Sequence, residues 1–185
     1  MRLITITAAL ALTLLTASYA SADPYVSPWA GVNFGSDIDN GRGAFGARAG
    51  AMGAGAIGGE VNFGFSPKFF GTDNDFGNNT LMDLMANLIV GIPIGGQYGP
   101  GFRPFALVGL GLIRTQIDGG DVFDVKASNN DFGWNAGVGA MGYFNDHFGL
   151  RGDVGYFRNF NGDTIDTLDL GSLHYWRASI GVVFR

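Results

Sequence analysis

The chain of 185 residues contains no cysteine, and lysine and glutamate are nearly missing as well. Without cysteine there is no disulfide framework and no thiolate metal site. Lysine occurs only at Lys68 and Lys126, and glutamate only at Glu60. Both residue types are strong helix formers. Their scarcity beside 32 glycines and many aromatic residues therefore favours β structure with many turns over helices.

Long apolar runs are absent after residue 22. No later stretch reaches the roughly 20 residues that a membrane-spanning helix needs. The longest runs, 84–94 and 105–113, have the length of β-strands. Cationic excess is missing too: the formal net charge is −5, which argues against nucleic acid as a partner.

The beginning of the chain has the pattern of a secretory signal peptide. Arg2 supplies the positive end, residues 3–16 form a short apolar core, and Ala20-Ser21-Ala22 matches a cleavage site. We therefore predict a signal peptide over 1–22 and one domain over 23–185, a length that suits a single domain.

The stretch 132–156 predicts two strands joined by a tight turn at 145–147. Because side chains on a strand alternate between its faces, the second strand has an apolar face and a charged face. The apolar face carries Phe148, Leu150, Val154 and Tyr156, and the other face carries Arg151 and Asp153.

Aromatic residues mark the ends of this hairpin. Trp134 and Phe144 are ten residues apart, and Phe148 and Tyr156 are eight apart. For strands that rise roughly 3.3 Å per residue and tilt about 40°, these spacings cover roughly 20–25 Å along a barrel axis. Outer-membrane barrels have an apolar band about 25 Å tall between two aromatic girdles. The spacing predicts a membrane-crossing hairpin, and a hairpin of a soluble β-sandwich is the alternative.

Eight strand-like segments follow one another along the domain. They are 29–35, 45–52, 57–66, 81–92, 104–116, 132–144, 148–159 and 173–184. Long acidic connections alternate with short or glycine-rich ones, as in outer-membrane barrels. We therefore predict an all-β fold, an eight-stranded antiparallel up-and-down transmembrane β-barrel, with both ends of the chain on the periplasmic side.

Six charged residues fall on the strand faces opposite the apolar ones. They are Arg48, Glu60, Asp83, Arg151, Asp153 and Arg177. Because a charge in lipid costs several kcal/mol, we predict an ion-pair network in the lumen. A turn centred near Ala54–Gly55 would bring Arg48 and Glu60 to similar heights and predicts an ion pair between them. Side chains fill an eight-stranded barrel, so at most weak ion conductance is expected.

Four motifs give the chain a family resemblance. WAGVNFG, PFALVGLGL, GVGAMGYFNDHFGLRGDVGYF and YWRASIGVVFR resemble the outer membrane protein A-like and X-like small β-barrel family over nearly all of 25–185. The resemblance implies the bacterial outer membrane, with its lipid and lipopolysaccharide, as the location. It implies a non-enzymatic role in envelope integrity, surface interaction or weak conductance, with no cofactor.

The resemblance also implies a signal in the last strand for the barrel-assembly machinery. In the family this signal ends in an aromatic residue. Here it consists of Phe184 with Val182 and Ile180 at alternate positions, and Arg185 follows Phe184.

The long connections carry eleven aspartates against only Arg42 and Lys126. The aspartates are Asp37, Asp39, Asp73, Asp75, Asp118, Asp121, Asp124, Asp131, Asp163, Asp166 and Asp169. Solubility and turn formation explain them in part. Weak binding of divalent cations is the sharper hypothesis, since carboxylate oxygens suit Ca²⁺ or Mg²⁺.

Catalysis has little support in the sequence. His147 lies in a predicted turn, and His174 lies beside Ser172 with Asp169 close by. We expect no enzyme. A barrel enzyme that modifies lipid or lipopolysaccharide is one alternative. A soluble, exported lipocalin-like binder, with the apolar face inside and Arg151, Asp153 and Arg177 in water, is another.

Overall fold

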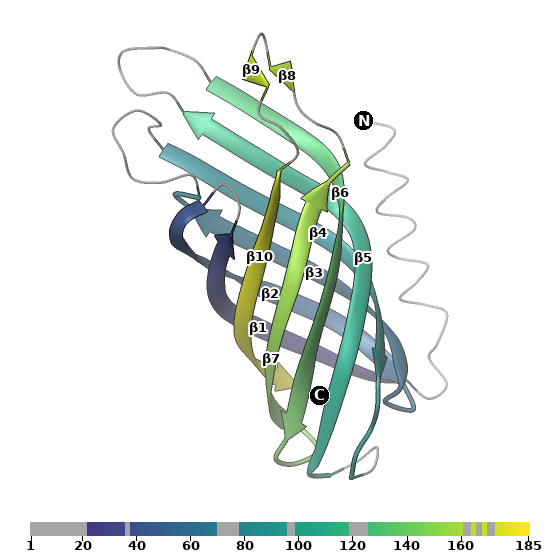
Figure 1. Cartoon of the computed structure of the whole chain (residues 1–185). Helices are drawn as coiled ribbons and strands as arrows, with labels where there is room; N and C mark the ends of the chain where they lie inside the picture. The colour runs from purple at the N-terminus through teal and green to yellow at the C-terminus, as the bar shows by residue number, and fades with distance from the viewer. Residues whose placement is uncertain are drawn as a thin grey trace.

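A closed antiparallel β-barrel makes up the computed structural model (Figure 1). It describes residues 22–35, 38–69, 78–95, 99–118, 126–160, 164–165, 168–169 and 173–185. The barrel strands are β1 (Ala22–Gly35), β2 (Ile38–Gly53), β3 (Ile57–Pro67), β4 (Asn78–Gly91), β5 (Gly101–Asp118), β6 (Lys126–Tyr143), β7 (Phe148–Asn159) and β10 (His174–Phe184). Two short strands, β8 (Thr164–Ile165) and β9 (Leu168–Asp169), pair only with each other.

Each barrel strand pairs with its neighbours along the chain, and β1 pairs with β10 to close the sheet. The closing pair aligns Val26 with Phe184 and Trp29 with Gly181. The predicted eight-stranded all-β architecture is confirmed. Among the described residues, no helix is long and apolar enough to cross a membrane. The predicted signal peptide lies outside the described residues apart from Ala22, which begins β1.

Several strands are longer than the sequence predicted. β1 begins seven residues before the predicted start at Trp29, although it contains Pro24 and Pro28. The pairing of β1 with β10 skips Pro28, which has no N–H to donate. β2 begins at Ile38 and β6 at Lys126, inside stretches predicted as loops. In both strands, the backbone pairing with the neighbouring strand continues beyond the stretch in which apolar and polar residues alternate.

The barrel has two distinct ends. The turn end carries the connections 54–56, 92–100 and 144–147 together with the C-terminus, at the bottom of Figure 1. The loop end carries the connections 36–37, 68–77, 119–125 and 160–173. In the β2–β3 turn the Ala56 N–H donates to Gly53 O at 3.0 Å, and the two central residues, Ala54 (48°) and Gly55 (68°), have positive φ. In the β6–β7 turn, Asn145 Oδ1 accepts bonds from the N–H groups of His147 and Phe148, both at 2.9 Å.

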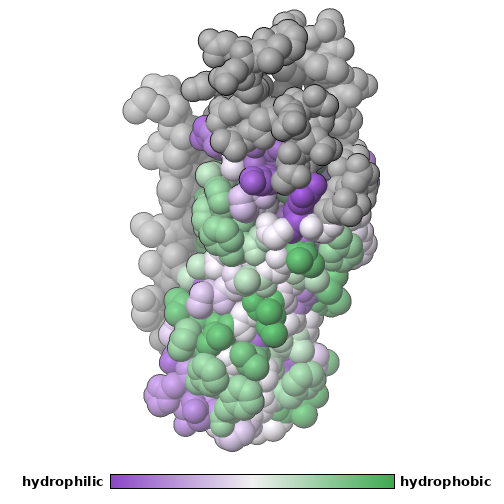
Figure 2. Space-filling view, turned by 90° about the vertical axis from the view of Figure 1, so that its left-hand side faces the viewer, coloured by the Kyte–Doolittle hydropathy of each residue, from purple (hydrophilic) through white to green (hydrophobic). Residues whose placement is uncertain are grey.

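Apolar side chains face outward around the wall. Ile180 is 64% exposed and Leu150 41%, whereas Arg151 is 1% exposed and Arg177 2%. Broad apolar areas cover the wall in Figure 2. This inside–outside assignment excludes the lipocalin-like alternative, which needed the opposite one.

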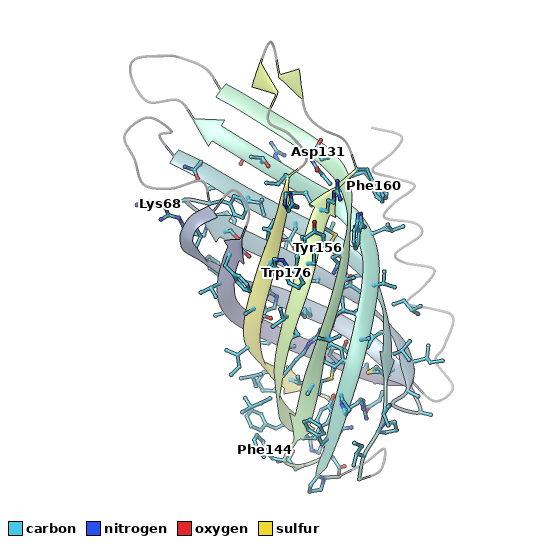
Figure 3. The ribbon with its side chains drawn as sticks, in the orientation of Figure 1. Lys68, Asp131, Phe144, Tyr156, Phe160 and Trp176 are labelled. Carbon is cyan, nitrogen blue, oxygen red and sulfur yellow. The ribbon has the colours of Figure 1, made fainter. Side chains whose placement is uncertain are left out.

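Aromatic rings form a group near each end of the outward face. At the turn end, Phe148 lies 5.6 Å from Phe144 and 6.0 Å from Phe184, between ring centroids. Toward the loop end, Tyr156 lies 5.6 Å from Trp134 and 5.2 Å from Trp176. Figure 3 labels Phe144 near the bottom, and Tyr156 and Trp176 above it. The positions agree with the two girdles predicted from the hairpin.

Candidate functional site

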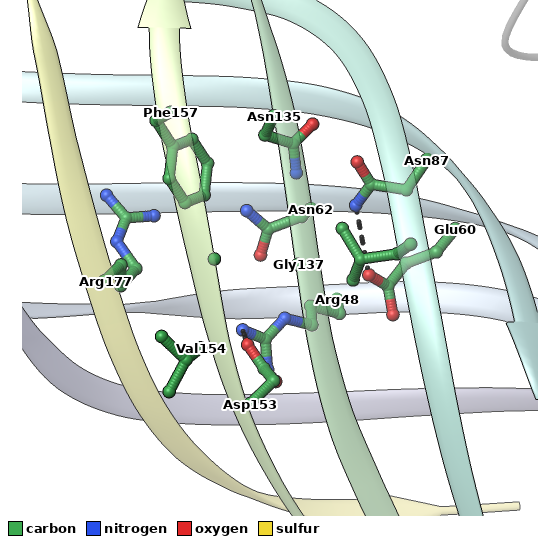
Figure 4. Close-up of a pocket in the computed structure, with 12 residues that line it drawn as sticks. Arg48, Glu60, Asn62, Asn87, Asn135, Gly137, Asp153, Val154, Phe157 and Arg177 are labelled. Atoms are coloured by element: carbon green, nitrogen blue, oxygen red, sulfur yellow. Dashed lines mark hydrogen bonds and ion pairs between the residues drawn. The ribbon is translucent and has the colours of Figure 1, made fainter.

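The six predicted lumen charges all lie inside the barrel, in the layer drawn in part in Figure 4. Five of the residues are 1–5% exposed, and the side chain of Asp153 is 9% exposed. They come from five strands, β2, β3, β4, β7 and β10. They all face the lumen because each strand turns every second residue toward the barrel axis. The arrangement therefore gathers three cations and three anions away from water.

The first group of charges is a chain of four residues. Arg151 forms an ion pair with Glu60, and its Nε donates to Asp153 Oδ2 at 3.0 Å. Asp153 Oδ1 in turn accepts from Arg48 Nη2 at 3.0 Å. The hydroxyl of Ser179 bridges Arg48 and Asp153, at 2.8 and 3.0 Å. Each charge in this chain has a partner of opposite sign.

The predicted ion pair between Arg48 and Glu60 is wrong. The β2–β3 turn is where the sequence placed it, but the register aligns Glu60 with Gly50 and Arg48 with Asn62. Glu60 instead receives bonds from Arg151, from the Tyr25 hydroxyl at 2.7 Å and from Asn87 Nδ2 at 3.2 Å. Partners reach across the narrow lumen, so pairing between adjacent strands does not decide the network.

The second group is a bidentate pair. The guanidinium of Arg177 donates to Asp83 Oδ1 at 3.1 Å and to Oδ2 at 2.6 Å. Its Nε donates to Asn33 Oδ1 at 2.8 Å. Bidentate contacts of this kind are the stronger and more directional form of the arginine–carboxylate pair.

Trp29 contacts both groups. The guanidinium carbon of Arg48 lies 4.9 Å from the Trp29 ring centroid and that of Arg177 lies 5.0 Å from it. The indole N–H donates to Asn62 Oδ1 at 3.0 Å. The indole therefore interacts favourably with both cations.

Sequence reasoning missed several lumen residues. Trp29 and Asn33 lay in the predicted strand 29–35, whose glycines and small apolar residues gave no distinct inward face. Tyr25 lay before the start of that strand, and Arg103 lay in the connection before the predicted strand 104–116. Arg103 is 3% exposed and its guanidinium carbon lies 5.3 Å from the Tyr143 ring centroid. Its spacing of two residues from Phe105 was the available signal, because residues two apart share a face and both lie on the inward face of β5.

A small cavity remains in the polar layer. It leaves about 20 Å³ for the centre of a water molecule, room for about one water. Asn87 Oδ1, Asn135 Oδ1 and Arg48 Nη1 border it and have no hydrogen-bond partner among the described residues.

Apolar clusters close the lumen on both sides of this layer. The turn-end cluster contains Tyr25, Met52, Ile89, Phe105, Met141, Tyr143 and Val183. The loop-end cluster contains Phe69, Leu81, Met85, Ile113, Phe157 and Tyr175. Most of these side chains are fully buried, so apolar groups fill the described lumen on both sides of the polar layer.

The predicted assembly signal lies on the outward face of β10. Ile180 and Phe184 are exposed and Val182 is half-buried, all on one face. Arg185 turns the other way: its Nη1 donates to Asp23 Oδ2 at 2.8 Å, and its guanidinium carbon lies 3.7 Å from the Tyr143 ring centroid. Recognition by the assembly machinery stays a prediction.

Most of the acidic loop residues lie outside the described part of the chain or have only their backbone described. Asp131 is different, because it lies in β6 and is buried rather than in a loop. Within the described residues, no group of three or more His, Asp or Glu side chains could hold a metal ion. The divalent-cation hypothesis stays a prediction.

The two histidines do not assemble a catalytic group within the described residues. His147 lies in the β6–β7 turn, as predicted. His174 begins β10, with its ring 6.2 Å from that of Tyr156. Ser172 lies outside the described residues, and only the backbone of Asp169 is described.

Comparison with known proteins agrees with this geometry. The family model for the outer membrane protein beta-barrel domain matches residues 7–184. No curated protein matches the chain.

Solved structures with the same architecture include three bacterial surface barrels. Neisserial surface protein A has a TM-score of 0.65 at 16% identity, over 89% of this chain and 98% of that chain. The N-terminal β-barrel domain of Pseudomonas aeruginosa OprF has 0.58 at 18%, over 89% and 96%. Ail of Yersinia pestis, solved in complex with the heparin analogue sucrose octasulfate, has 0.54 at 14%, over 89% and 99%. At these identities the likeness shows the fold.

Proposed function

Because the chain belongs to the outer membrane protein β-barrel domain family, we propose that it acts in the bacterial outer membrane as a non-enzymatic envelope or surface protein. The location follows from the family, and the role is our proposal. In it, the loop end faces the exterior and the turn end faces the periplasm. Lipid and lipopolysaccharide surround the apolar wall, and the barrel-assembly machinery inserts the chain.

The filled interior is the observation that carries this role. Paired charges occupy the middle of the lumen, and apolar clusters lie on both sides of them. A diffusion channel needs a hydrated path, whereas eight strands leave an interior that side chains can fill. The support is thus for a rigid membrane anchor that presents loops, with weak ion leakage at most.

Sulfated glycans are not the surface ligand that we propose. Ail was solved with such a polyanion. Between the barrel strands at the loop end, the connections carry eight aspartates and one basic residue, Lys68, so they would repel a polyanion. Weak binding of divalent cations suits the aspartates of the loop end better. A calorimetric titration of the folded protein with Ca²⁺ should give heat above dilution, and its absence would remove cations from the proposal.

Conductance in planar bilayers tests the proposed role. We expect the folded protein to give no large, steady channel current. A variant that thins the loop-end cluster, Leu81→Ala with Met85→Ala, should raise ion leakage because both side chains are fully buried there. A large steady current from the unmodified protein would contradict the role of anchor and support that of a pore.

Enzymatic modification of lipid is the competing function, and His174 is the residue to test. We expect a His174→Ala strain to keep the lipid profile of the parent strain. A defined change in acyl chains or phosphate groups, restored by the parental gene, would favour the enzyme instead.

A further inference from the structure

Exposed basic side chains gather at one end of the barrel. Among the described side chains, Lys68, Arg114 and Arg158 are exposed, and all three lie toward the loop end. The basic residues at the turn end are packed instead. Arg103 and the side chain of Arg185 are each 3% exposed, and both guanidinium groups lie over the ring of Tyr143. The described barrel thus offers exposed positive charge to its surroundings at the loop end only.

Arg158 lies among aromatic rings on the outward face. In register it is opposite Trp134 of β6 on one side and His174 of β10 on the other. Tyr156, two residues earlier on β7, has its ring 5.6 Å from that of Trp134. Phe160, two residues later, stacks on Phe132 at 5.8 Å. Figure 3 shows Tyr156 and Phe160 along β7 with Trp176 alongside.

The residues around Arg158 indicate how deep it lies in the bilayer. Arginine on the lipid face costs about 2–4 kcal/mol at the midplane and about 0–1 kcal/mol near an interface. The aromatic rings above and below Arg158 belong to the residue types that mark the interface. Arg158 therefore belongs to the loop-end group of aromatic residues, where an arginine on the lipid face costs least.

Arg158 takes part in no ion pair with any described residue. A guanidinium presents two parallel N–H donors that match a phosphate group. Trp134 is its register partner on β6, and the rings of Trp134 and Trp176 both lie against Tyr156, two residues before Arg158. The electron-rich faces of these rings suit the C–H groups of a sugar.

We propose that Arg158 and these three rings bind a phosphorylated sugar headgroup of an outer-leaflet glycolipid. The phosphate accepts hydrogen bonds from the Arg158 guanidinium, and the sugar packs on the rings. Arg114 lacks such a setting, since its register partners are Met82 and Asn130. The site rests on the proposed function, which places the loop end in the outer leaflet.

Binding of lipid A to the folded full-length protein in detergent tests the site. Native mass spectrometry would count bound lipid A for the unmodified protein, Arg158→Gln and Arg158→Lys. We expect Arg158→Gln to weaken binding about tenfold, as loss of one charged hydrogen-bonding group predicts, and Arg158→Lys to weaken it less. Dephosphorylated lipid A should bind as weakly to the unmodified protein as lipid A binds to Arg158→Gln.

Arg114→Gln is the matched control, because it removes the same charge from the same end of the barrel. It should bind lipid A like the unmodified protein. Equal losses in both variants would overturn the site in favour of general charge attraction, and no loss in Arg158→Gln would overturn it outright. Equal binding of lipid A and dephosphorylated lipid A to the unmodified protein would also overturn the site. Gel mobility of Arg158→Gln before and after boiling separates these failures from failure of the barrel placement itself.

Discussion

At the scale of single residues, the lumen is so tightly filled that some positions accept no side chain. A Cβ on Gly109 would lie 2.0 Å from Asn87 Oδ1 and 2.6 Å from both Asn135 Oδ1 and Ala86 O. A Cβ on Gly46 would lie 2.0 Å from Phe63 O and 2.8 Å from Trp29. The polar layer therefore depends on glycines that let the other side chains meet.

Gly109→Ala should destabilise the barrel by about 1–3 kcal/mol, because the new methyl group must displace two buried amide groups and crowd a backbone carbonyl. The measurement is urea unfolding in lipid vesicles. Gly142→Ala is the control, since a Cβ there meets nothing within 4 Å. Equal stability of the two variants would contradict the packing described here.

Glu60→Gln should cost about 3–5 kcal/mol, because it leaves Arg151 with less negative charge in a buried setting. Adding Arg151→Met to the same chain should recover part of the loss, since the unpaired cation is then removed. Guanidinium unfolding of both single variants and the double variant measures this coupling. Strictly additive losses would show that the two side chains do not act as a pair.

At the scale of elements, the sequence predicted the number and order of the barrel strands and which side chains face outward. It could do so because an apolar surrounding requires apolar side chains at every second position of each strand. The range of β7 was predicted without error, from Phe148 to Asn159. Beyond the apolar band, outward side chains need not be apolar, so the alternation of apolar and polar residues no longer shows where the strand pairing continues. The early starts of β2 and β6 were missed for this reason.

The lumen partners could be predicted as a set but not as pairs. Alternation placed Arg48, Glu60, Arg151 and Asp153 on the inward face. Pairing depends on how far each side chain reaches across the axis and on what else fills the lumen. Trp29 and Ser179 occupy space that single-strand patterns do not reveal.

Phe184→Ala should lower the amount of folded protein in the outer membrane, because β10 would lose the aromatic residue of the predicted assembly signal. The readout is the ratio of heat-modifiable to total protein in the membrane fraction. Phe144→Ala is the control, since Phe144 contacts the same ring, Phe148, from the β6–β7 turn. If both variants lose equal amounts, the aromatic group stabilises the barrel and β10 carries no separate signal.

At the scale of the whole molecule, closure by the pairing of β1 with β10 leaves the barrel without an open sheet edge. Closed sheets satisfy their backbone groups within the wall, which is what a hydrocarbon environment requires. Unfolding must therefore break long ladders and a polar interior together, so the barrel should open slowly.

Unheated samples should migrate differently from boiled ones in a detergent gel, because the closed barrel survives the detergent at room temperature. The comparison uses membrane-extracted protein with and without boiling. Identical mobility, together with recovery in the soluble periplasmic fraction, would contradict the membrane placement.

The chain has three tryptophans, and their positions divide them into two optical populations. Trp134 and Trp176 lie on the outer wall, whereas Trp29 is 5% exposed between two guanidinium groups. Brominated acyl chains should therefore quench most of the emission and spare a residual component. The unquenched emission should disappear in Trp29→Phe. It would therefore report on the interior of the protein while the barrel is embedded in a bilayer.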